Sequence, residues 1–424
     1  APGKFNLLID EKNYKEGIIE VNSSGNGYLL MPEGQEDIFV ARKNLGRAFN
    51  GDLVFVYQFN RKKGGKNEGE VVEIIERKIQ NFVGILDRKK DFGFVNTRGN
   101  KIHTDFFIEP EELKDFKDGD KVIISLKEWP KKASSPYGRI INSLGQPGEL
   151  NTEMHTIMHD YSFPEYFPVD VINYTQKISK KTEKNQISAR RDFRKKTTFT
   201  IDPVTAKDFD DAISYAPLPG NKIEIGIHIA DVSHYVKPNT ILDEEAYKRA
   251  TSVYLVDRVV PMLPELLSNG VCSLRPKEEK FTFSAVFVLN EKMVIEEEWF
   301  GKTLIYSDHR FSYEEVQFIL DSEEKRVTAD VSLSGQPYSV SNEIYFALIK
   351  LNSYAKSLRE KRMKKGALSF DRVEVKFDLD KHDNPSSIYF STSKDAKKLV
   401  EELMLLANRR VAEFIGKFKQ KKPF

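Results

Sequence analysis

The stretch TIDPVTAKDFDDAI, at residues 200–213, concentrates acidic side chains that could take part in chemistry. It contains Asp202, Asp208, Asp210 and Asp211. Four like charges this close repel one another, and burying them without a partner is costly. Because apolar residues interleave with the aspartates, we expect partial burial and therefore a compensating partner.

Two simpler explanations of this acidic stretch are a calcium loop and a surface turn. An EF-hand counted from Asp202 would need Gly at position 6 and Glu at position 12, where the sequence has Lys207 and Ile213. Counted from Asp208, the same positions hold Ile213 and Pro219, so the calcium loop fails in both frames. A surface turn stays open because Asp is common in turns, although the interleaved apolar residues argue against it.

A divalent cation suits these side chains better. A site made only of carboxylate oxygens favours Mg²⁺, or Mn²⁺, over zinc. Mg²⁺ held in this way keeps several waters and shares its ligand shell with substrate phosphates. One or two such ions can activate a water and stabilise the leaving oxygen in phosphodiester hydrolysis. The spacing alone leaves this chemistry and an acidic turn as alternatives.

The segments after the acidic stretch have the pattern of an α/β (α+β) domain. KIEIGIHIADVSHYV carries isoleucine at alternate positions, which predicts a strand, and FTFSAVFVL at 281–289 alternates in the same way. Residues 341–364 and 394–418 have apolar residues at helical spacing, which predicts two long amphipathic helices. We therefore expect a catalytic domain over residues 200–424.

The first 145 residues contain an internal repeat. GIIEV at 17–21 corresponds to GILD at 84–87, and GDLVFV at 51–56 corresponds to GDKVII at 119–124. Each unit has the pattern of five short strands with Gly and Asn/Asp turns, which is typical of a small barrel. We expect one OB-type β-barrel over residues 1–80 and a second over 81–146.

Aromatic residues lie in the predicted strands of both units. Tyr28 and Phe39 belong to the first unit, and Phe94 and Phe107 to the second. Their placement resembles the nucleic-acid motifs of cold-shock domains, in which such rings stack on unpaired bases. The alternative is that they fill the barrels, which must hold for some aromatics because strand alternation sends half of them inward.

A basic connecting region precedes the acidic stretch. Residues 147–199 are mostly polar and helical in character, and 177–196 carry nine Lys or Arg against only Glu183 and Asp192. Such a block could be solvated surface, or it could hold a polyanion beside a cation site. Arg191 is the residue in this block that we expect to contact RNA.

The composition excludes several classes of protein. The sequence has no apolar run long enough for a membrane span and no secretory signal. Its single cysteine, Cys272, excludes an intramolecular disulfide framework and a cysteine-based zinc cluster. We expect a cytoplasmic protein that is a monomer and has no membrane partner.

Taken together, these motifs resemble the ribonuclease II / ribonuclease R family of exoribonucleases, and more closely the ribonuclease R side. The family pattern is Ile-Asp, five residues, then Asp-x-Asp-Asp-Ala, and it matches residues 201–212. The similarity continues through IHIADVSHYV, TSVYLVDRVVPMLPELLSNGVCSL, GALSFDRVEVKF and KLVEELMLLANRRVAEF. It covers about residues 15–424, including both barrels, which the resemblance identifies as cold-shock type OB domains.

The resemblance implies a processive 3′→5′ exoribonuclease that degrades single-stranded RNA to nucleoside 5′-monophosphates with Mg²⁺. It makes the four aspartates the metal and catalytic carboxylates. It makes Tyr254 the residue that stacks on a terminal base, Phe370 the clamp on the other side of that base, and Glu402 an acidic residue at the end of the RNA channel. Phe377 is an alternative clamp. A non-catalytic RNA-binding protein on the same scaffold is the alternative function.

The sequence departs from the family pattern after GKFKQKKPF. Family members continue with the rest of the catalytic domain, including an essential arginine, and with a C-terminal OB domain. The resemblance therefore implies an incomplete RNB-type catalytic domain with impaired catalysis. It also implies that a complementary C-terminal segment packs against residues 200–424.

Overall fold

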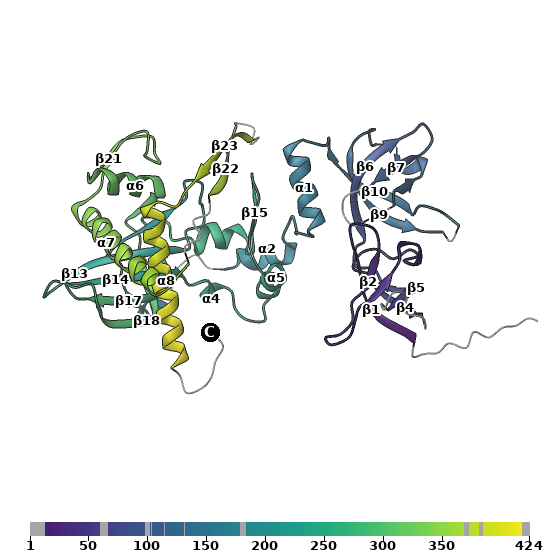
Figure 1. Ribbon diagram of the computed structural model, residues 1–424. Coiled ribbons are helices and arrows are strands. Elements are labelled where there is room, and N and C mark those ends of the chain that lie inside the picture. The colour runs from purple at the N-terminus through teal and green to yellow at the C-terminus, as the bar shows by residue number, and fades with distance from the viewer. Residues whose placement is uncertain are drawn as a thin grey trace, which may run out of the picture. The chain divides into compact units, whose positions relative to one another are not determined.

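The structure is a computed structural model in which two compact units, Ala1–Glu165 and Tyr166–Phe424, are each described by themselves (Figure 1). The described residues are 13–59, 67–97, 102, 104–113, 115–130, 132–178, 184–368, 373–380 and 385–417.

The first unit begins with a closed five-stranded barrel, barrel 1. Its strands are β1 (Tyr14–Val21), β2 (Gly27–Leu29), β3 (Ile38–Val40), β4 (Leu53–Gln58) and β5 (Glu68–Glu76), in the order β1-β2-β3-β5-β4 around the wall. A short 3₁₀ turn, η2 (Arg42–Asn44), follows β3. Position 27 of β2 has no room for a side chain, because a Cβ atom there would lie 2.7 Å from the Leu45 side chain.

A second closed barrel, barrel 2, repeats the pattern. It consists of β6 (Asn81–Arg88), β7 (Gly93–Asn96), β8 (Phe106–Ile108), β9 (Lys121–Glu128) and β10 (Tyr137–Gly145), with η3 (Pro110–Leu113) between β8 and β9. Helix α1 (Leu150–Asp160) follows and packs against β6 and β10. The predicted pair of OB-type barrels is confirmed.

The second unit is built on a seven-stranded sheet in the order β11-β18-β17-β14-β13-β12-β19. Its strands are β11 (Arg191–Asp192), β12 (Thr197–Asp202), β13 (Asp211–Leu218), β14 (Lys222–Ala230), β17 (Glu279–Leu289), β18 (Ile295–Tyr306) and β19 (His309–Ser312). Most neighbours are antiparallel, but β12 runs parallel to β19, and β11 runs parallel to β18.

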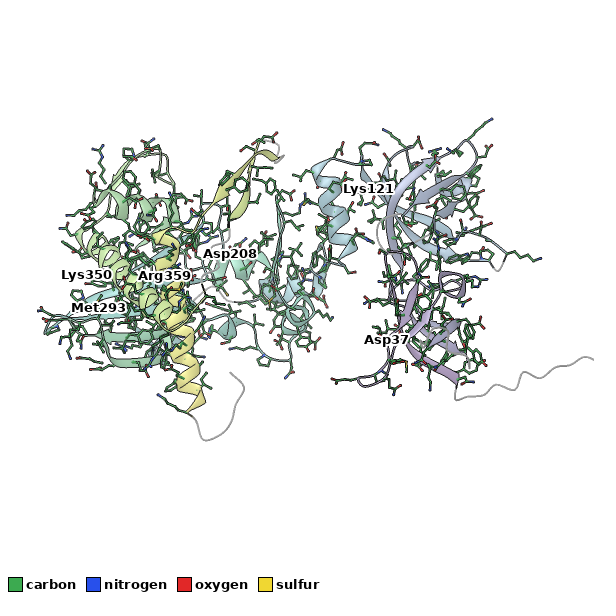
Figure 2. All side chains as sticks on the ribbon, in the orientation of Figure 1. Asp37, Lys121, Asp208, Met293, Lys350 and Arg359 are labelled. Atoms are coloured by element: carbon green, nitrogen blue, oxygen red, sulfur yellow. The ribbon has the colours of Figure 1, made fainter. Side chains whose placement is uncertain are left out.

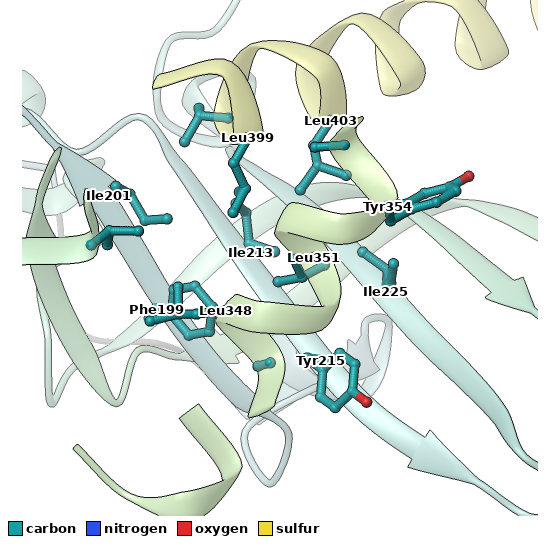
Figure 3. Close-up of a cluster of buried hydrophobic side chains, with 14 of the residues drawn as sticks. Phe199, Ile201, Ile213, Tyr215, Ile225, Leu348, Leu351, Tyr354, Leu399 and Leu403 are labelled. Atoms are coloured by element: carbon teal, nitrogen blue, oxygen red, sulfur yellow. The ribbon is translucent and has the colours of Figure 1, made fainter. Parts of the chain in front are cut away.

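Three helices cover one face of this sheet: α6 (Tyr313–Ser322), α7 (Asn342–Lys364) and α8 (Asp395–Gly416). The two long helices predicted from periodicity are therefore confirmed. Figure 3 shows Phe199, Ile201, Ile213, Tyr215 and Ile225 of the sheet against Leu348, Leu351 and Tyr354 of α7 and Leu399 and Leu403 of α8. Each large apolar side chain buried in this way contributes about 1.5–3 kcal/mol to folding.

The unit has a second hydrophobic core, whose buried residues include Phe193, Phe209, Leu242 and Leu267. The elements around it are α2 (Val169–Gln176), α4 (Val232–Tyr235), α5 (Ile241–Arg249) and η4 (Leu266–Val271). The remaining elements are α3 (Lys184–Ser188), β15 (Val253–Tyr254), β16 (Val259–Val260), β20 (Arg326–Val327), β21 (Tyr338–Ser339), β22 (Glu374–Leu379) and β23 (Pro385–Ser391). Within the described part of the chain, no helix has the length and apolarity that crossing a membrane requires.

The domain boundaries expected near residues 80, 146 and 199 stay predictions. The barrel strands end at Glu76 and Gly145, and the sheet of the second unit already includes Arg191 and Asp192 in β11.

Candidate functional site

Asp202 is the last residue of β12 and lies opposite Ser312 of β19. Because side chains alternate along a strand, Phe199 and Ile201 enter the helix-covered core while Asp202 points elsewhere. Asp202 is only 7% exposed, and its Oδ2 atom has no hydrogen-bond partner among the described residues. A buried carboxylate oxygen without a partner is rare in folded proteins and indicates a place for a ligand.

The loop between β12 and β13 carries Asp208, labelled in Figure 2, and Asp210, and Asp211 is the first residue of β13. The backbone of the loop is firmly held. The amide of Ala230 donates to the Asp210 carbonyl at 2.9 Å, and the amide of buried Phe209 donates to Ser273 Oγ at 3.0 Å. The loop therefore has a defined course, while the Asp210 side chain remains exposed.

Arg310 of β19 is a functional candidate that the sequence analysis missed. Its Nη2 atom donates to the carbonyl oxygens of Pro203, Val204 and Ala206 at 3.1, 2.9 and 3.3 Å. Its guanidinium also lies 4.8 Å from the centroid of the Phe209 ring. One cation thus fixes the start of the acidic loop. No local sequence signal identifies it, since more than 100 residues separate it from the loop.

The carboxylates of this site are electrostatically crowded. The pKa of Asp202 is raised to about 7, mainly by burial and in part by the charge of Asp211, while the Thr200 side chain and Arg310 oppose the rise. Burial and the charge of Asp210 raise the pKa of Asp211 to about 6. Although the Asp210 side chain is exposed, partial desolvation of its carboxylate and the charge of Asp208 raise the pKa of Asp210 as well. A nearby cation would relieve this repulsion.

These observations fit a hard divalent cation. The available donors are carboxylate oxygens, which Mg²⁺ and Mn²⁺ prefer, and the unpartnered Oδ2 of Asp202 is one of them. No group of three or more His, Cys, Asp or Glu side chains in the described ranges already stands in a metal-binding arrangement. The fit therefore rests on donor chemistry and on the unpartnered oxygen.

Tyr254 is brought to the acidic loop, as its predicted role requires. It lies in β15, and its hydroxyl donates to Asp208 Oδ2 at 3.1 Å. The side chain is 66% exposed. Burial of the hydroxyl and the charge of Asp208 raise the pKa of Tyr254. An open ring anchored beside a carboxylate cluster can stack on a base without losing its position.

Glu402 has a different partner. This α8 residue is 2% exposed and accepts from Arg362 Nη2 of α7 at 2.5 Å. It lines a cavity of about 700 Å³ together with Lys361 and Lys365. In the described part of the chain, no hydrogen bond or ion pair joins Glu402 to the four aspartates. Its place on the RNA path stays a prediction.

The structure describes one of the two candidate clamp residues. Phe370 lies outside the described residues. Phe377, the alternative, is 41% exposed on β22 opposite Ile388 of β23.

The predicted stacking residues form cross-strand pairs on both barrels. Tyr28 of β2 lies opposite Phe39 of β3, with ring centroids 5.5 Å apart. Phe94 of β7 lies opposite Phe107 of β8, at 5.6 Å. The neighbours of each ring along its strand are buried, so these four rings face outward. Phe106, by contrast, is fully buried and fills the barrel.

Arg191 is already engaged within the protein. Its Nη2 atom donates to Glu224 Oε2 at 2.6 Å, and its guanidinium lies 5.0 Å from the Phe193 ring and 5.1 Å from the Trp299 ring. These contacts give Arg191 a structural role in the sheet. Its contact with RNA stays a prediction.

Three family profiles match the chain in succession. The profile described as "Ribonuclease B OB domain" matches residues 17–74, "Cold shock domain" matches 94–168, and "RNB domain" matches 190–424. The first match falls on barrel 1, the second covers most of barrel 2 and helix α1, and the third contains the sheet and the acidic loop.

Two curated relatives are similar along nearly the whole chain. Ribonuclease R of Thermotoga maritima is 35% identical over 414 residues, which cover 97% of this chain and 56% of that protein. Ribonuclease R 1 of Lactococcus lactis is 32% identical over 428 residues, which cover 97% of this chain and 51% of that protein. The chain thus spans about half the length of these relatives.

Solved structures share the fold. Mycoplasma genitalium RNase R in complex with ribose-methylated single-stranded RNA has a TM-score of 0.84 and 24% identity, covering 95% of this chain and 62% of that one. Yeast Ssd1, described as a pseudonuclease, has a TM-score of 0.63 and 21% identity, covering 96% and 55%. The domain order, the fold and the profile match over more than half of its length show that the chain belongs to the RNB domain family.

Proposed function

We propose that the protein is a 3′→5′ exoribonuclease that hydrolyses single-stranded RNA to nucleoside 5′-monophosphates. The observation that carries this proposal is the acidic cluster at the end of β12, where Asp202 Oδ2 is buried and has no hydrogen-bond partner in the part of the chain that the structure describes. Its relatives include proteins named Ribonuclease R, which supports the same chemistry.

We propose that the four aspartates hold Mg²⁺, with Mn²⁺ as a substitute. When bound, the ion would activate a water and stabilise charge on the scissile phosphate. The chain itself supplies the positioning. Arg310 fixes the backbone at residues 203–206, and the β13 and β14 strands hold Asp211 and the Asp210 carbonyl. The unpartnered Asp202 oxygen is part of the proposed cradle.

Stacking explains how such an enzyme would accept any sequence. Every base has a π-face, and one base stacked on an aromatic ring is worth about 1–3 kcal/mol. We propose that Tyr254 stacks on the base at the 3′ end, with Phe370 on its other side and Glu402 further along the path. The outward pairs on the barrels would hold bases upstream, and basic side chains such as Arg191 would contact phosphates.

A second candidate is an RNA-binding protein without catalysis. Two observations favour it: the described residues show no ready-made metal arrangement, and a pseudonuclease shares the fold. In this case the acidic loop would have no catalytic role, and the aromatic pairs on the barrels would bind the RNA.

One experiment separates the two candidates. The protein is mixed with Mg²⁺ and 3′-labelled single-stranded RNA, alongside an Asp210→Asn variant, and released mononucleotide is measured. Asp→Asn preserves shape but removes one metal-neutralising charge, so we expect RNA binding to survive and mononucleotide release to disappear. Binding of Mn²⁺, followed by electron paramagnetic resonance, should weaken in the same variant. RNA binding without release, and Mn²⁺ binding unchanged by the substitution, would support the second candidate.

A further inference from the structure

The two barrels share one topology, but among the described residues a helix packs against barrel 2 alone. In barrel 2, α1 packs against β6 and β10. Met154 and Met158 of this helix are buried, and Glu153 pairs with Lys121 of β9 at 2.7 Å. An amphipathic helix is therefore already seated on strands β6 and β10 of barrel 2, with one ion pair to the first residue of β9.

The corresponding wall of barrel 1 consists of β1, β4 and β5. Here Val54 and Val56 point into the barrel, so the residues that alternate with them point outward. The strand register arranges the outward residues in three rows across the wall. These rows, together the outer face of barrel 1, are Tyr14–Tyr57–Glu70, Glu16–Phe55–Glu73 and Ile18–Leu53–Glu76.

Two β-bulges enlarge the apolar part of this face. The register of β5 against β4 shifts twice, and each shift adds one residue, Val72 or Ile75, beside an outward glutamate. Val72 is 46% exposed, Ile75 is 42% exposed and Ile18 is 47% exposed. Grouped apolar side chains on a surface that is rimmed by polar residues mark an interaction site.

The charge of the face restricts its partner. Glu16, Glu70, Glu73 and Glu76 are all exposed, and the three rows contain no lysine or arginine. RNA, a polyanion, would be repelled here. The face thus differs from the Tyr28–Phe39 pair on the same barrel. A complementary partner has an apolar stripe flanked by cations.

We propose that the outer face of barrel 1 docks an amphipathic helix of a partner protein, with lysine or arginine on both sides of its apolar stripe. The precedent within the molecule is α1 on barrel 2. The dimensions agree, because three rows along a strand span roughly 13 Å and a helix of three turns spans about 16 Å. The docking does not depend on the proposed RNA hydrolysis.

The probe for this docking is a fluorescent 14-residue helical peptide of Leu and Lys, with Leu at i, i+3, i+4 and i+7. Its control has Glu in place of Lys. Fluorescence anisotropy gives affinity, and hydrogen exchange of the whole chain gives the location. We expect the Leu/Lys peptide to bind at least about tenfold more tightly than its control. We expect it to protect residues 14–18, 53–57 and 70–76.

A charge-reversed variant tests the surface directly. Glu70→Lys with Glu73→Lys should weaken the Leu/Lys peptide by about tenfold or more. The matched control is Glu33→Lys with Glu36→Lys, which makes the same change of charge at exposed positions of the β2–β3 loop and should bind as the parent does. Val72→Ser with Ile75→Ser is a second test that keeps the charge, and it should also weaken binding. Thermal unfolding of each variant establishes that the barrel is folded.

Several results would overturn the proposal. Protection confined to residues 202–211 would place the peptide on the other acidic site. Equal binding of the Leu/Glu control, or full binding by both variants, would remove the role of this face. Protection of residues 14–18, 53–57 and 70–76 by single-stranded RNA alone, without peptide, would make the face an RNA surface. Protection of the same residues that grows with protein concentration, without peptide, would make a second copy the occupant.

Discussion

The acidic loop after β12 and the aromatic pairs on the barrels are both candidate RNA contacts. They differ in whether contacts within the protein already stabilise their side chains. The rings of Phe94 and Phe107 contact each other and leave no polar atom unpaired. Asp202, in contrast, has a buried oxygen without a partner and a pKa raised to about 7 by burial. The loop holds unfavourable electrostatics that a ligand would remove, whereas the barrels offer a surface that is stable without one.

This contrast predicts that changes in the loop alter turnover and that changes on the barrels alter affinity. The largest effect is expected for Asp210→Asn, which should lower single-turnover hydrolysis by about 10³-fold. RNA affinity, measured by anisotropy, should stay within about threefold. Asp330→Asn, at an exposed position of the same unit, is the matched control. An equal loss of turnover and affinity would show that the loop also contributes to RNA binding.

The second prediction concerns stability against pH without metal. The Asp202 carboxyl is protonated in the folded state up to about pH 7 but has an ordinary pKa of 3.8 when unfolded. The unfolded state therefore binds fewer protons over this range, so the free energy of unfolding should fall as pH rises from about 4 to 7 and level off above. We expect this contribution to be a few kcal/mol.

Urea unfolding at pH 5 and pH 7.5 measures this slope. Asp202→Asn should reduce the slope and leave the smaller part that the raised pKa of Asp211 contributes, and Mg²⁺ should raise the stability at pH 7.5. Phe107→Ala, on the barrel side of the comparison, should leave the slope unchanged. If the slope persists in Asp202→Asn, other groups cause it.

The third prediction concerns Arg310. Arg310→Met removes the donor to three loop carbonyls, so the carboxylates lose their alignment and turnover should fall by roughly 10–100-fold. Arg310→Lys keeps the charge and should recover part of the rate. Affinity for RNA should change little in either variant. A loss confined to affinity would place Arg310 on the RNA path instead of in the support of the loop.

The smallest effect is expected on the barrels. Phe107→Ala removes one stacking platform, worth about 1–3 kcal/mol, and should weaken single-stranded RNA binding without changing turnover at saturating RNA. Ile141→Ala, another exposed apolar residue of barrel 2, is the control. If the control weakens binding equally, contact area and not stacking explains the affinity.

The features that could be predicted from the sequence are those written in local patterns. The repeat of GIIEV and GILD predicted two barrels, and the spacing of Leu399 and Leu403 predicted a long helix. These signals are local because strands and helices have fixed periods.

The features that could not be predicted depend on which segments meet in space. Arg310 reaches the acidic loop only because β19 pairs in parallel with β12. The partners of Arg191 and Glu402, namely Glu224 and Arg362, come from other strands and helices. Each of these residues is an ordinary charged residue in the sequence, so the residues around it do not predict that it forms an internal ion pair.

The position of β19 at the end of the strand order has a consequence for the thermal stability of the site. Among the described residues, β12 is the one strand that pairs with β19, and β19 carries the arginine that holds the acidic loop. Marginal elements of a fold open locally before its centre does. On warming, the alignment of the carboxylates should therefore be lost at a lower temperature than the sheet itself, so that inactivation precedes melting.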